Sequence, residues 1–522
     1  LETGLTRRKN NISVAIKNIA DFAVSTLLFW MFGFGFMFGL SASGWIGADS
    51  FFLDFGSEGT FNSVFFIFQA VFCGTAVTIL SGAIAERVRF FAYIVFSVLI
   101  SGFIYPIAGH WTWHGINLSE SAGWLANMGF IDFAGSTLVH SVGGWASLAV
   151  LLIIGSRHGR FDGNEQNQGF VGSNLPISAL GALLLYIGWI GFNGGSELSL
   201  NSRTITIIAN TLMAGAAGTI APTVFNFWGE GIARVDSIIN GVLAGLVAIT
   251  AACFAVTTLS AVLIGLIGGV VMSLVAIVLE RWQIDDAIGA IPVHLGAGIW
   301  GTLAVGIFGD LSVIGTGLTR GEQIGVQVLG IVVYGVWTFG LMYVLTWIIN
   351  RYTPIRVTAD QEKSGLNYSE HGVRDPWIEL IEHMDGQAEK KNWGQRAPVE
   401  PFTTAGRVAE QYNSVLKVLN QVVTNSNAII DRAMDGIITF SQADLAVLTV
   451  NPAAERIFGY GQREITQRPI TDLLRTNQAN QNQKDDVALR TFKPILQDAA
   501  QIKYPIELIG HPHDGRSAQS DT

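Results

Sequence analysis

The chain has 522 residues, of which half are hydrophobic, only 14% are charged and 60 are glycine. This composition excludes an ordinary soluble enzyme, in which about a quarter of the residues are charged. The formal net charge of −9 says little about orientation in a membrane, because acidic residues barely affect it. The two cysteines, Cys73 and Cys253, both fall within apolar runs, so no disulfide framework is implied.

Apolar runs recur from residue 19 to residue 350, and each of about 20 residues is long enough to cross a hydrocarbon core of about 30 Å. There are ten of them, near residues 19–43, 61–84, 90–109, 132–155, 174–194, 203–228, 236–257, 259–279, 285–309 and 323–350. The sequence therefore predicts an all-α polytopic membrane protein with a membrane domain over residues 1–350.

The basic residues orient these spans. If the chain before the first span is cytoplasmic, the outer loops hold only Arg203 and Arg320. The inner side then holds Arg7, Arg8, Lys9, Lys17, Arg87, Arg89, Arg157, Arg160, Arg234, Arg281, Arg351, Arg356 and Lys363. The positive-inside rule therefore favours this topology, which places the C-terminal tail in the cytoplasm.

Two segments of the chain repeat one pattern in opposite directions. DFAGSTLVH at 132–140 and DAIGAIPVH at 286–294 match at aspartate, glycine, valine and histidine. In the predicted topology one copy enters from outside and the other from inside, which is typical of an inverted repeat. At a rise of about 1.5 Å per residue each histidine lies roughly 12 Å from its own surface. His140 and His294 are therefore expected to meet near the midplane.

A single membrane histidine is as well explained by a hydrogen bond between helices. Two histidines related by an inverted repeat favour a functional site, because ionisable groups at this depth are costly and transporter sites lie at the repeat interface. Asp132 and Asp286 each stand where a helix starts. A capping role is the first interpretation for both, since a carboxylate there accepts free backbone N–H groups.

The run from about 5 to 372 resembles the ammonium transporter (Amt/Mep/Rh) family. The motifs that carry the resemblance are GLTRRKN at 4–10, FQAVFCGTAVTILSGAIAERVRF at 68–90, YPIAGHWTW at 105–113, DFAGSTLVH at 132–140, YIGWIGFNGGS at 186–196, ERWQIDDAIGAIPVHLGAGIWG at 280–301 and GLNYSEHG at 365–372. The resemblance implies an eleven-span fold with an inverted 5+5 repeat, a homotrimer, and a narrow pore through each subunit. GLTRRKN matches the junction after the family's first span, so most of that span is expected to be missing here.

The same resemblance implies roles for four pore residues. His140 and His294 match the pore-lining twin histidines, Phe72 the outer gate, and Trp113 the external recruitment site, where Phe72 also contributes. Taken alone, Trp113 would be assigned as a membrane-interface anchor and Phe72 as ordinary packing.

Two positions depart from the family pattern. With the Asn210-Thr211 pair as anchor, Ile208 occupies the place where many relatives carry a second gating phenylalanine, which puts a two-ring gate in doubt. Asn367 stands where the tail motif usually has aspartate, which puts in doubt how the tail docks onto neighbouring subunits.

The residues predict transport without enzymatic turnover, and no cofactor or nucleic-acid partner is indicated. Aromatic faces attract an ammonium ion at about 0.5 to 2 kcal/mol per contact, and carrying its charge to the bilayer centre costs about 3 kcal/mol or more. Ammonium can escape this cost by giving up a proton and crossing as ammonia. The expected location is the plasma (inner) membrane, in contact with lipid.

The composition changes beyond residue 350. Residues 351–405 read as a polar tail and linker, and residues 406–430 carry a short heptad pattern typical of a coiled coil. A simple amphipathic helix that packs on the next domain is the alternative. Residues 428–522 resemble a partial α+β PAS sensory domain, with VNPAAERIFGY at 450–460 as its most telling piece. HPHDGRS at 511–517 resembles the hairpin of the PAS sheet.

Two functions remain open at this stage. The first is an ammonium transporter with a regulatory tail. The second is a receptor that uses the transporter scaffold to sense ammonium and passes the signal to an output domain, or to a regulatory protein, on the cytoplasmic side. The histidine pair, Phe72 and Trp113 favour conduction, whereas the heptads, the PAS segment and Ile208 favour sensing.

Overall fold

A computed structural model of the chain describes residues 1–56, 59–116, 123–161, 170–390, 394–441, 446–466 and 468–470. The chain divides into two compact units, Leu1–Asp375 and Pro376–Thr522. The first unit extends past the predicted end of the membrane domain at residue 350, because the start of the tail packs on the membrane helices.

The ten predicted spans are confirmed within the described residues. Nine helices are long and apolar enough to cross a membrane, and the tenth is the shorter apolar helix α12. In chain order the membrane helices are α2 (Asn11–Leu28) and α3 (Phe34–Phe38), α4 (Gly59–Ala83), α5 (Phe90–Leu99) and α6 (Tyr105–Trp113), α8 (Val142–Ile154), α9 (Leu175–Gly195), α10 (Ser202–Gly218) and α11 (Ile220–Glu230), α12 (Val235–Thr250), α13 (Thr258–Arg281), α14 (Ala297–Phe308) and α16 (Arg320–Tyr352). The short helix α1 (Glu2–Leu5) precedes them, and between them lie α7 (Trp124–Asn127), α15 (Leu311–Ile314) and the hairpin of β1 (Ser41–Ala42) and β2 (Ile46–Gly47).

Wider π-helical turns interrupt four of these spans. Two of them, Phe29–Gly33 and Ile100–Ile104, join α2 to α3 and α5 to α6. The other two, Ser136–Ser141 and Ile291–Gly296, open the spans of α8 and α14 and each contain a histidine. Such turns are rare and are frequently found at functional sites.

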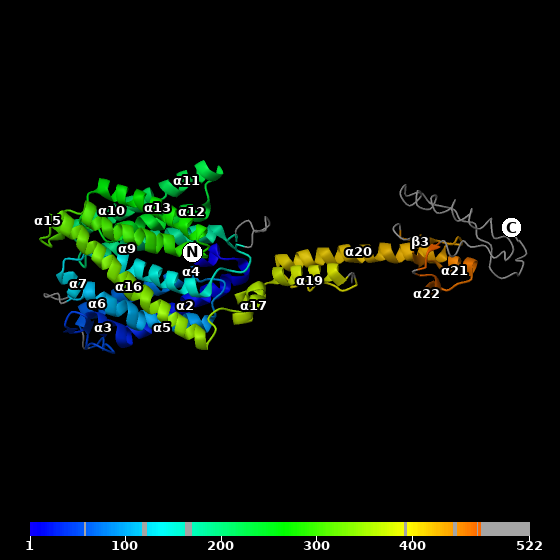
Figure 1. Cartoon of the computed structure of the whole chain (residues 1–522), viewed down its shortest axis with the longest axis horizontal. Helices are drawn as coiled ribbons and strands as arrows, with labels where there is room; N and C mark the ends of the chain where they lie inside the picture. Colours follow the sequence, from blue (N-terminus) through cyan, green and yellow to red (C-terminus); the bar gives the residue numbers. More distant parts are fainter. Residues whose placement is uncertain are drawn as a thin grey trace, which may run out of the picture. The chain divides into compact units, whose positions relative to one another are not determined.

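Helix α16 is the longest element and crosses the bundle obliquely (Figure 1). It starts with a capping box, in which the side chains of Thr319 and Glu322 satisfy each other's backbone N–H groups. Its 33 residues span about 50 Å at 1.5 Å per residue. It packs against both α8 and α14, so it supports the two histidine-bearing spans together.

The start of the tail folds back onto the N-terminal helix of the same unit. Helices α17 (Ala359–Ser364) and α18 (Leu366–His371) follow α16. Asn367 is buried, donates Nδ2–H to the Arg8 carbonyl at 3.0 Å and accepts the Ser13 backbone N–H at 3.0 Å. An aspartate would lack the amide donor, so the departure at Asn367 changes a buried hydrogen bond that holds the tail within one subunit.

The second unit begins with a helical hairpin. Helix α19 (Pro376–Lys390) lies alongside the first half of α20 (Thr404–Arg432), as Figure 1 shows in yellow. Leu380 and Ala409 are buried between them, and Tyr412 donates a hydrogen bond to Gln387 at 2.8 Å. The rest of the described part comprises β3 (Ile438–Phe440) paired antiparallel with β4 (Val447–Val450), then α21 (Pro452–Phe458) and α22 (Gln462–Ile465). This arrangement agrees with a PAS domain, and HPHDGRS lies outside the described residues.

Helix α20 covers the predicted heptad segment 406–430. The heptad pattern has one seam of Val408, Val415, Val422 and Ile429 and a companion seam of Tyr412, Leu419 and Ser426. The first seam is open, since Val415, Val422 and Ile429 are 64%, 55% and 71% exposed. The companion seam is used within the chain at Tyr412, which packs against α19. The first half of α20 therefore packs as an amphipathic helix, but on the preceding helix α19 and not on the next domain. Coiled-coil pairing of the second half stays a prediction.

Candidate functional site

The two repeated segments have the same local structure. The Asp132 carboxylate accepts backbone N–H groups of Gly135 at 3.1 Å and Thr137 at 2.9 Å, three and five residues on. The Asp286 carboxylate accepts those of Gly289 at 3.0 Å and, again five residues on, Ile291 at 2.6 Å. Both aspartates therefore cap the segments that hold the histidines, which supports the architectural interpretation.

A glycine with positive φ makes each of these turns possible. Gly135 has φ of +108° and Gly289 has φ of +82°, a region that residues with a Cβ rarely adopt. In the first copy, the His140 N–H reaches back five residues to the Gly135 carbonyl at 3.0 Å. The Asp, Gly and His positions that the two motifs share therefore form the same local structure in both copies.

The two histidines meet, as the repeat predicts. Nδ1 of His140 lies 3.1 Å from Nδ1 of His294, and the ring planes differ by 19°. His140 is fully buried, and its Nε2 atom has no hydrogen-bond partner among the described residues. The pair presents two linked imidazoles within the apolar bundle.

Aromatic rings lead from one side to this pair. Phe72 on α4 is edge-on to Trp113 at 5.6 Å between ring centroids. Phe72 also lies against Phe192 at 4.2 Å, and Phe192 is 5.5 Å from the His140 ring. Trp189 stacks on His140 at 5.2 Å. The rings form a continuous path from Trp113 and Phe72 to the histidines.

Trp113 is not a surface anchor. Its side chain is 3% exposed, and its indole N–H donates to the Asp132 carbonyl at 2.7 Å. That bond ties Trp113 to the start of the first histidine segment, so the aromatic ring and the histidine are held by one local framework.

The expectation that Ile208 takes the place of a second pore ring is wrong. Ile208 packs against the backbone of Gly194, whereas the ring that lies against Phe72 belongs to Phe192. Phe192 and Trp189 were both missed as site residues. Their signal is the spacing of three within YIGWIGFNGGS, which places both rings on one face of α9.

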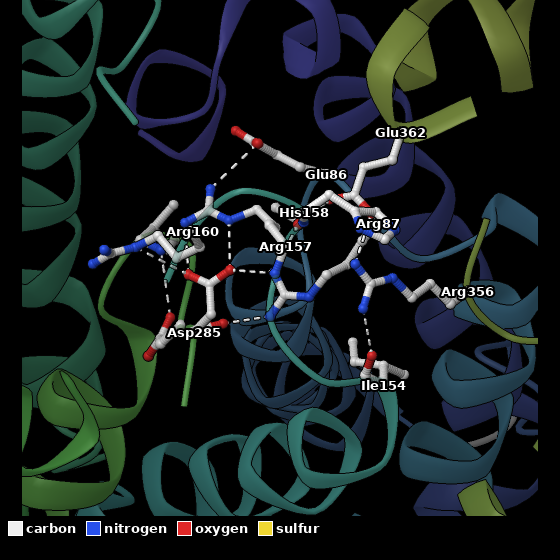
Figure 2. A network of polar contacts seen from close by, with 12 residues as sticks. Glu86, Arg87, Ile154, Arg157, His158, Arg160, Asp285, Arg356 and Glu362 are labelled. Atoms are coloured by element: carbon white, nitrogen blue, oxygen red, sulfur yellow. Dashed lines mark hydrogen bonds and ion pairs between the residues drawn. The ribbon is translucent and has the colours of Figure 1, made fainter. Parts of the chain in front are cut away.

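A buried network of charges lies at the helix ends that the topology predicts to be cytoplasmic (Figure 2). Arg157, just after α8, binds the Asp285 carboxylate through two nitrogens, at 2.7 and 2.8 Å. Arg157 also lies 3.3 Å from Glu86, and Arg87 lies 3.5 Å from Asp285. Asp285 directly precedes the capping residue Asp286, so this ion pair joins the C-terminal end of one histidine span to the start of the other.

The charges in this network stabilise each other. Burial alone would raise the pKa of the Asp285 carboxyl, but the hydrogen bonds and charge of Arg157 outweigh it and hold this pKa well below its usual range. The pKa of Glu86 is likewise lowered, because Arg157 and Arg7 outweigh its burial. Both carboxylates are therefore ionised at neutral pH and balance the buried guanidinium groups.

The tail is connected to the same network. Glu362 accepts a hydrogen bond from Arg356 at 2.8 Å and from the His158 backbone N–H at 2.8 Å. The Nη1 atom of Arg356 donates to the carbonyl of Ile154, the last residue of α8, at 2.8 Å. Figure 2 shows these residues around the C-terminal end of that helix.

Comparison with known proteins agrees with this architecture. The family model of the Ammonium Transporter Family matches residues 1–375, and a PAS domain model matches residues 426–493. The chain is 48% identical over 420 residues, 80% of this chain and 77% of the relative, to a Synechocystis sp. protein that is provisionally named an ammonium transporter. It is 40% identical over 387 residues to the ammonium transporter Amt2 of Archaeoglobus fulgidus, covering 72% of this chain and 83% of that one.

Solved structures show the same fold. A structure described as a sensor Amt protein matches with a TM-score of 0.67 and 41% identity, over 71% of this chain and 92% of that chain. Saccharomyces cerevisiae Mep2 matches with a TM-score of 0.61 and 25% identity, over 69% of this chain and 83% of that chain. The fold and the paired histidine segments define a multi-pass membrane protein built as an inverted repeat. The chain belongs to the ammonium transporter family and carries a C-terminal PAS domain.

Proposed function

We propose that this protein transports ammonium by binding the ion at the outer aromatic site and passing ammonia and a proton separately along the histidine pair. The observation that carries the proposal is the 3.1 Å contact between Nδ1 of His140 and Nδ1 of His294. The functional form is expected to be a homotrimer in the inner membrane with its tail in the cytoplasm.

The first step is recruitment. An ammonium ion over the faces of Phe72 and Trp113 gains about 0.5 to 2 kcal/mol per good contact, because the ring quadrupole attracts a cation. This attraction favours other small cations equally. Discrimination must arise deeper in the pore, where a full charge costs about 3 kcal/mol or more. Potassium cannot avoid that cost, whereas ammonium can release a proton and continue as neutral ammonia.

The histidine pair supplies what the released proton and the ammonia need. In a bond between two Nδ1 atoms, one neutral ring donates and the other accepts. The donating ring then has a lone pair on Nε2, and the accepting ring has an N–H there. One acceptor and one donor therefore face the pore, and transfer of a proton along the pair exchanges these roles. Each cycle splits one ammonium into ammonia and one proton and recombines them on the other side.

Current recordings test the proposal directly. On membranes that contain the protein, a jump in ammonium concentration should drive a saturable current, and an equal jump in potassium should drive none. Protein-free membranes provide the background. A silent protein, or equal currents with both ions, would contradict transport by this route.

A second function, ammonium sensing, is favoured by a separate observation. The PAS match at 426–493 follows a helix with an open apolar seam, and one of the most similar solved structures is described as a sensor Amt protein. In this case the ammonium-bound membrane domain would change the packing of α20 and so signal to an output domain or a regulatory protein.

Sensing predicts an ammonium-dependent change in α20. Allosteric coupling is typically worth about 1 to 3 kcal/mol, so amide hydrogen exchange over residues 404–432 should change about five-fold or more when the full-length protein is saturated with ammonium. Helix α20 is suited to such a change because most of the stability of a helix in a protein comes from its packing, and the apolar seam of α20 is exposed. Potassium at equal ionic strength is the control. Unchanged exchange alongside a robust ammonium current would exclude the sensor and leave a transporter with a separate regulatory domain.

A further inference from the structure

Among the described residues of the membrane domain three glutamines are buried, and one of them differs from the others. Gln323 and Gln327 are fully buried, and their Oε1 atoms accept hydrogen bonds from Thr316 at 2.7 Å and from the Ile131 N–H at 2.9 Å. Gln69 is 3% exposed, yet its Oε1 atom has no partner among the described residues. A buried acceptor without a partner is destabilising, and such exceptions call for an explanation.

The position of Gln69 in the fold offers an explanation for its unpartnered oxygen. It lies on α4 three residues before Phe72, which is about 4.5 Å nearer the predicted outer surface at 1.5 Å per residue. Gln69 shares a helix face with Cys73, four residues on. The Cys73 thiol contacts the Ser101 carbonyl at 3.8 Å, in the segment that continues into α6 and ends at Trp113. The side of α4 that carries Gln69 therefore faces the helix that carries Trp113.

The two rings leave the ion only partly bound. Phe72 and Trp113 attract positive charge through their faces and offer no acceptor, since the Trp113 N–H donates to the Asp132 carbonyl. An ammonium ion has four N–H donors, and each one that leaves water unpaired costs free energy. An amide oxygen one turn above Phe72 is a neutral acceptor, so it can pair with an N–H without trapping the ion as a carboxylate would.

We propose that the Oε1 atom of Gln69 accepts a hydrogen bond from ammonium at the outer aromatic site, and that this bond sets the affinity for small ammonium ions. This inference rests on the recruitment step proposed above. Gln69 acts at the binding step alone, because it lies outward of the rings that lead to the histidines.

Two matched variants separate the acceptor from the bulk of the side chain. Gln69→Leu keeps the size and removes the oxygen, whereas Gln69→Glu keeps an oxygen at the same position. Calorimetric titration of the purified full chain with ammonium chloride should show a roughly ten-fold to hundred-fold weaker Kd for Gln69→Leu, the effect expected for a hydrogen bond to a charged group. Gln69→Glu should bind at least as tightly as the unaltered protein.

Stability provides the folding control. Because the Gln69 oxygen accepts no bond within the described residues, Gln69→Leu should unfold at the same temperature as the unaltered protein or a higher one without ammonium. The stabilisation that ammonium adds should shrink with its affinity. Gln327→Leu, which removes hydrogen bonds that are formed, should lower the unfolding temperature and serves as the contrast.

The outcomes also separate this inference from the transport proposal. Equal ammonium affinity for Gln69→Leu and the unaltered protein would overturn the role of Gln69, as would an equal loss in Gln69→Glu. Tight ammonium binding without any ammonium current would overturn the transport proposal. The affinities of Gln69→Leu and the unaltered protein would still show whether Gln69 binds the ion. An unaltered protein that does not bind ammonium would overturn both.

Discussion

Replacing His140 with leucine should abolish the ammonium current or its discrimination against potassium, while the protein still folds and inserts. Leucine has similar bulk but no ring nitrogen, so it breaks the chain from Nδ1 of His140 to Nδ1 of His294. Positioned groups that transfer protons typically contribute about 10²- to 10⁴-fold, and a loss in that range is expected in the ammonium current measured on protein-containing membranes.

A double-variant series sharpens this expectation. Because the two rings act as one relay, His294→Leu should have an effect of the same size, and the double variant should be no worse than either single one. His158→Leu is the matched control, since this histidine is 51% exposed and lies outside the histidine pair. An unchanged current with unchanged rejection of potassium in His140→Leu would remove His140 from the mechanism.

Replacing Asp285 with asparagine should lower the free energy of unfolding by about 3–5 kcal/mol, the cost of breaking a buried ion pair by removing one partner. The side chains of Arg157 and Arg87 are 5% and 0% exposed, and both would lose a carboxylate. Glu280→Gln is the control. Its partner Arg160 and Glu280 itself are 24% and 57% exposed, so this pair is worth about 1 kcal/mol or less.

The pH dependence of this effect has a definite sign. The pKa of Asp285 is lower in the folded protein than in the unfolded chain, so its stabilisation is complete above the unfolded value of about 3.9. It is lost as the pH falls through the folded value. Denaturant unfolding of the purified protein should therefore give the same difference between Asp285→Asn and the unaltered protein at pH 7 and at pH 5.5. A difference that vanished by pH 5.5 would contradict a depressed pKa.

Local patterns in the sequence predicted the parts of the site that are themselves local. The Asp132 and Asp286 caps involve atoms three to five residues apart, and the shared spacing placed each histidine at the same depth. The ring that lies against Phe72 was missed because Ile208 was placed by its offset along the chain from the Asn210-Thr211 pair. Whether a ring on α9 reaches Phe72 depends on how α4 and α9 pack against each other. The periodicity of a single helix does not predict that packing.

The sequence by itself determined the membrane spans, the inverted repeat and the presence of a PAS-like segment, and it predicts the orientation of the spans. The spans follow from hydrophobic length and their predicted orientation from charge asymmetry, which are read over short stretches of about 25 residues or fewer. The PAS-like segment rests on a resemblance. Only the tertiary structure decided the pairing of Arg157 with Asp285, 128 residues away, and the docking of Asn367 onto Arg8, 359 residues away. A buried charge or amide needs a partner, but which partner it meets depends on the packing of helices that are far apart in the chain.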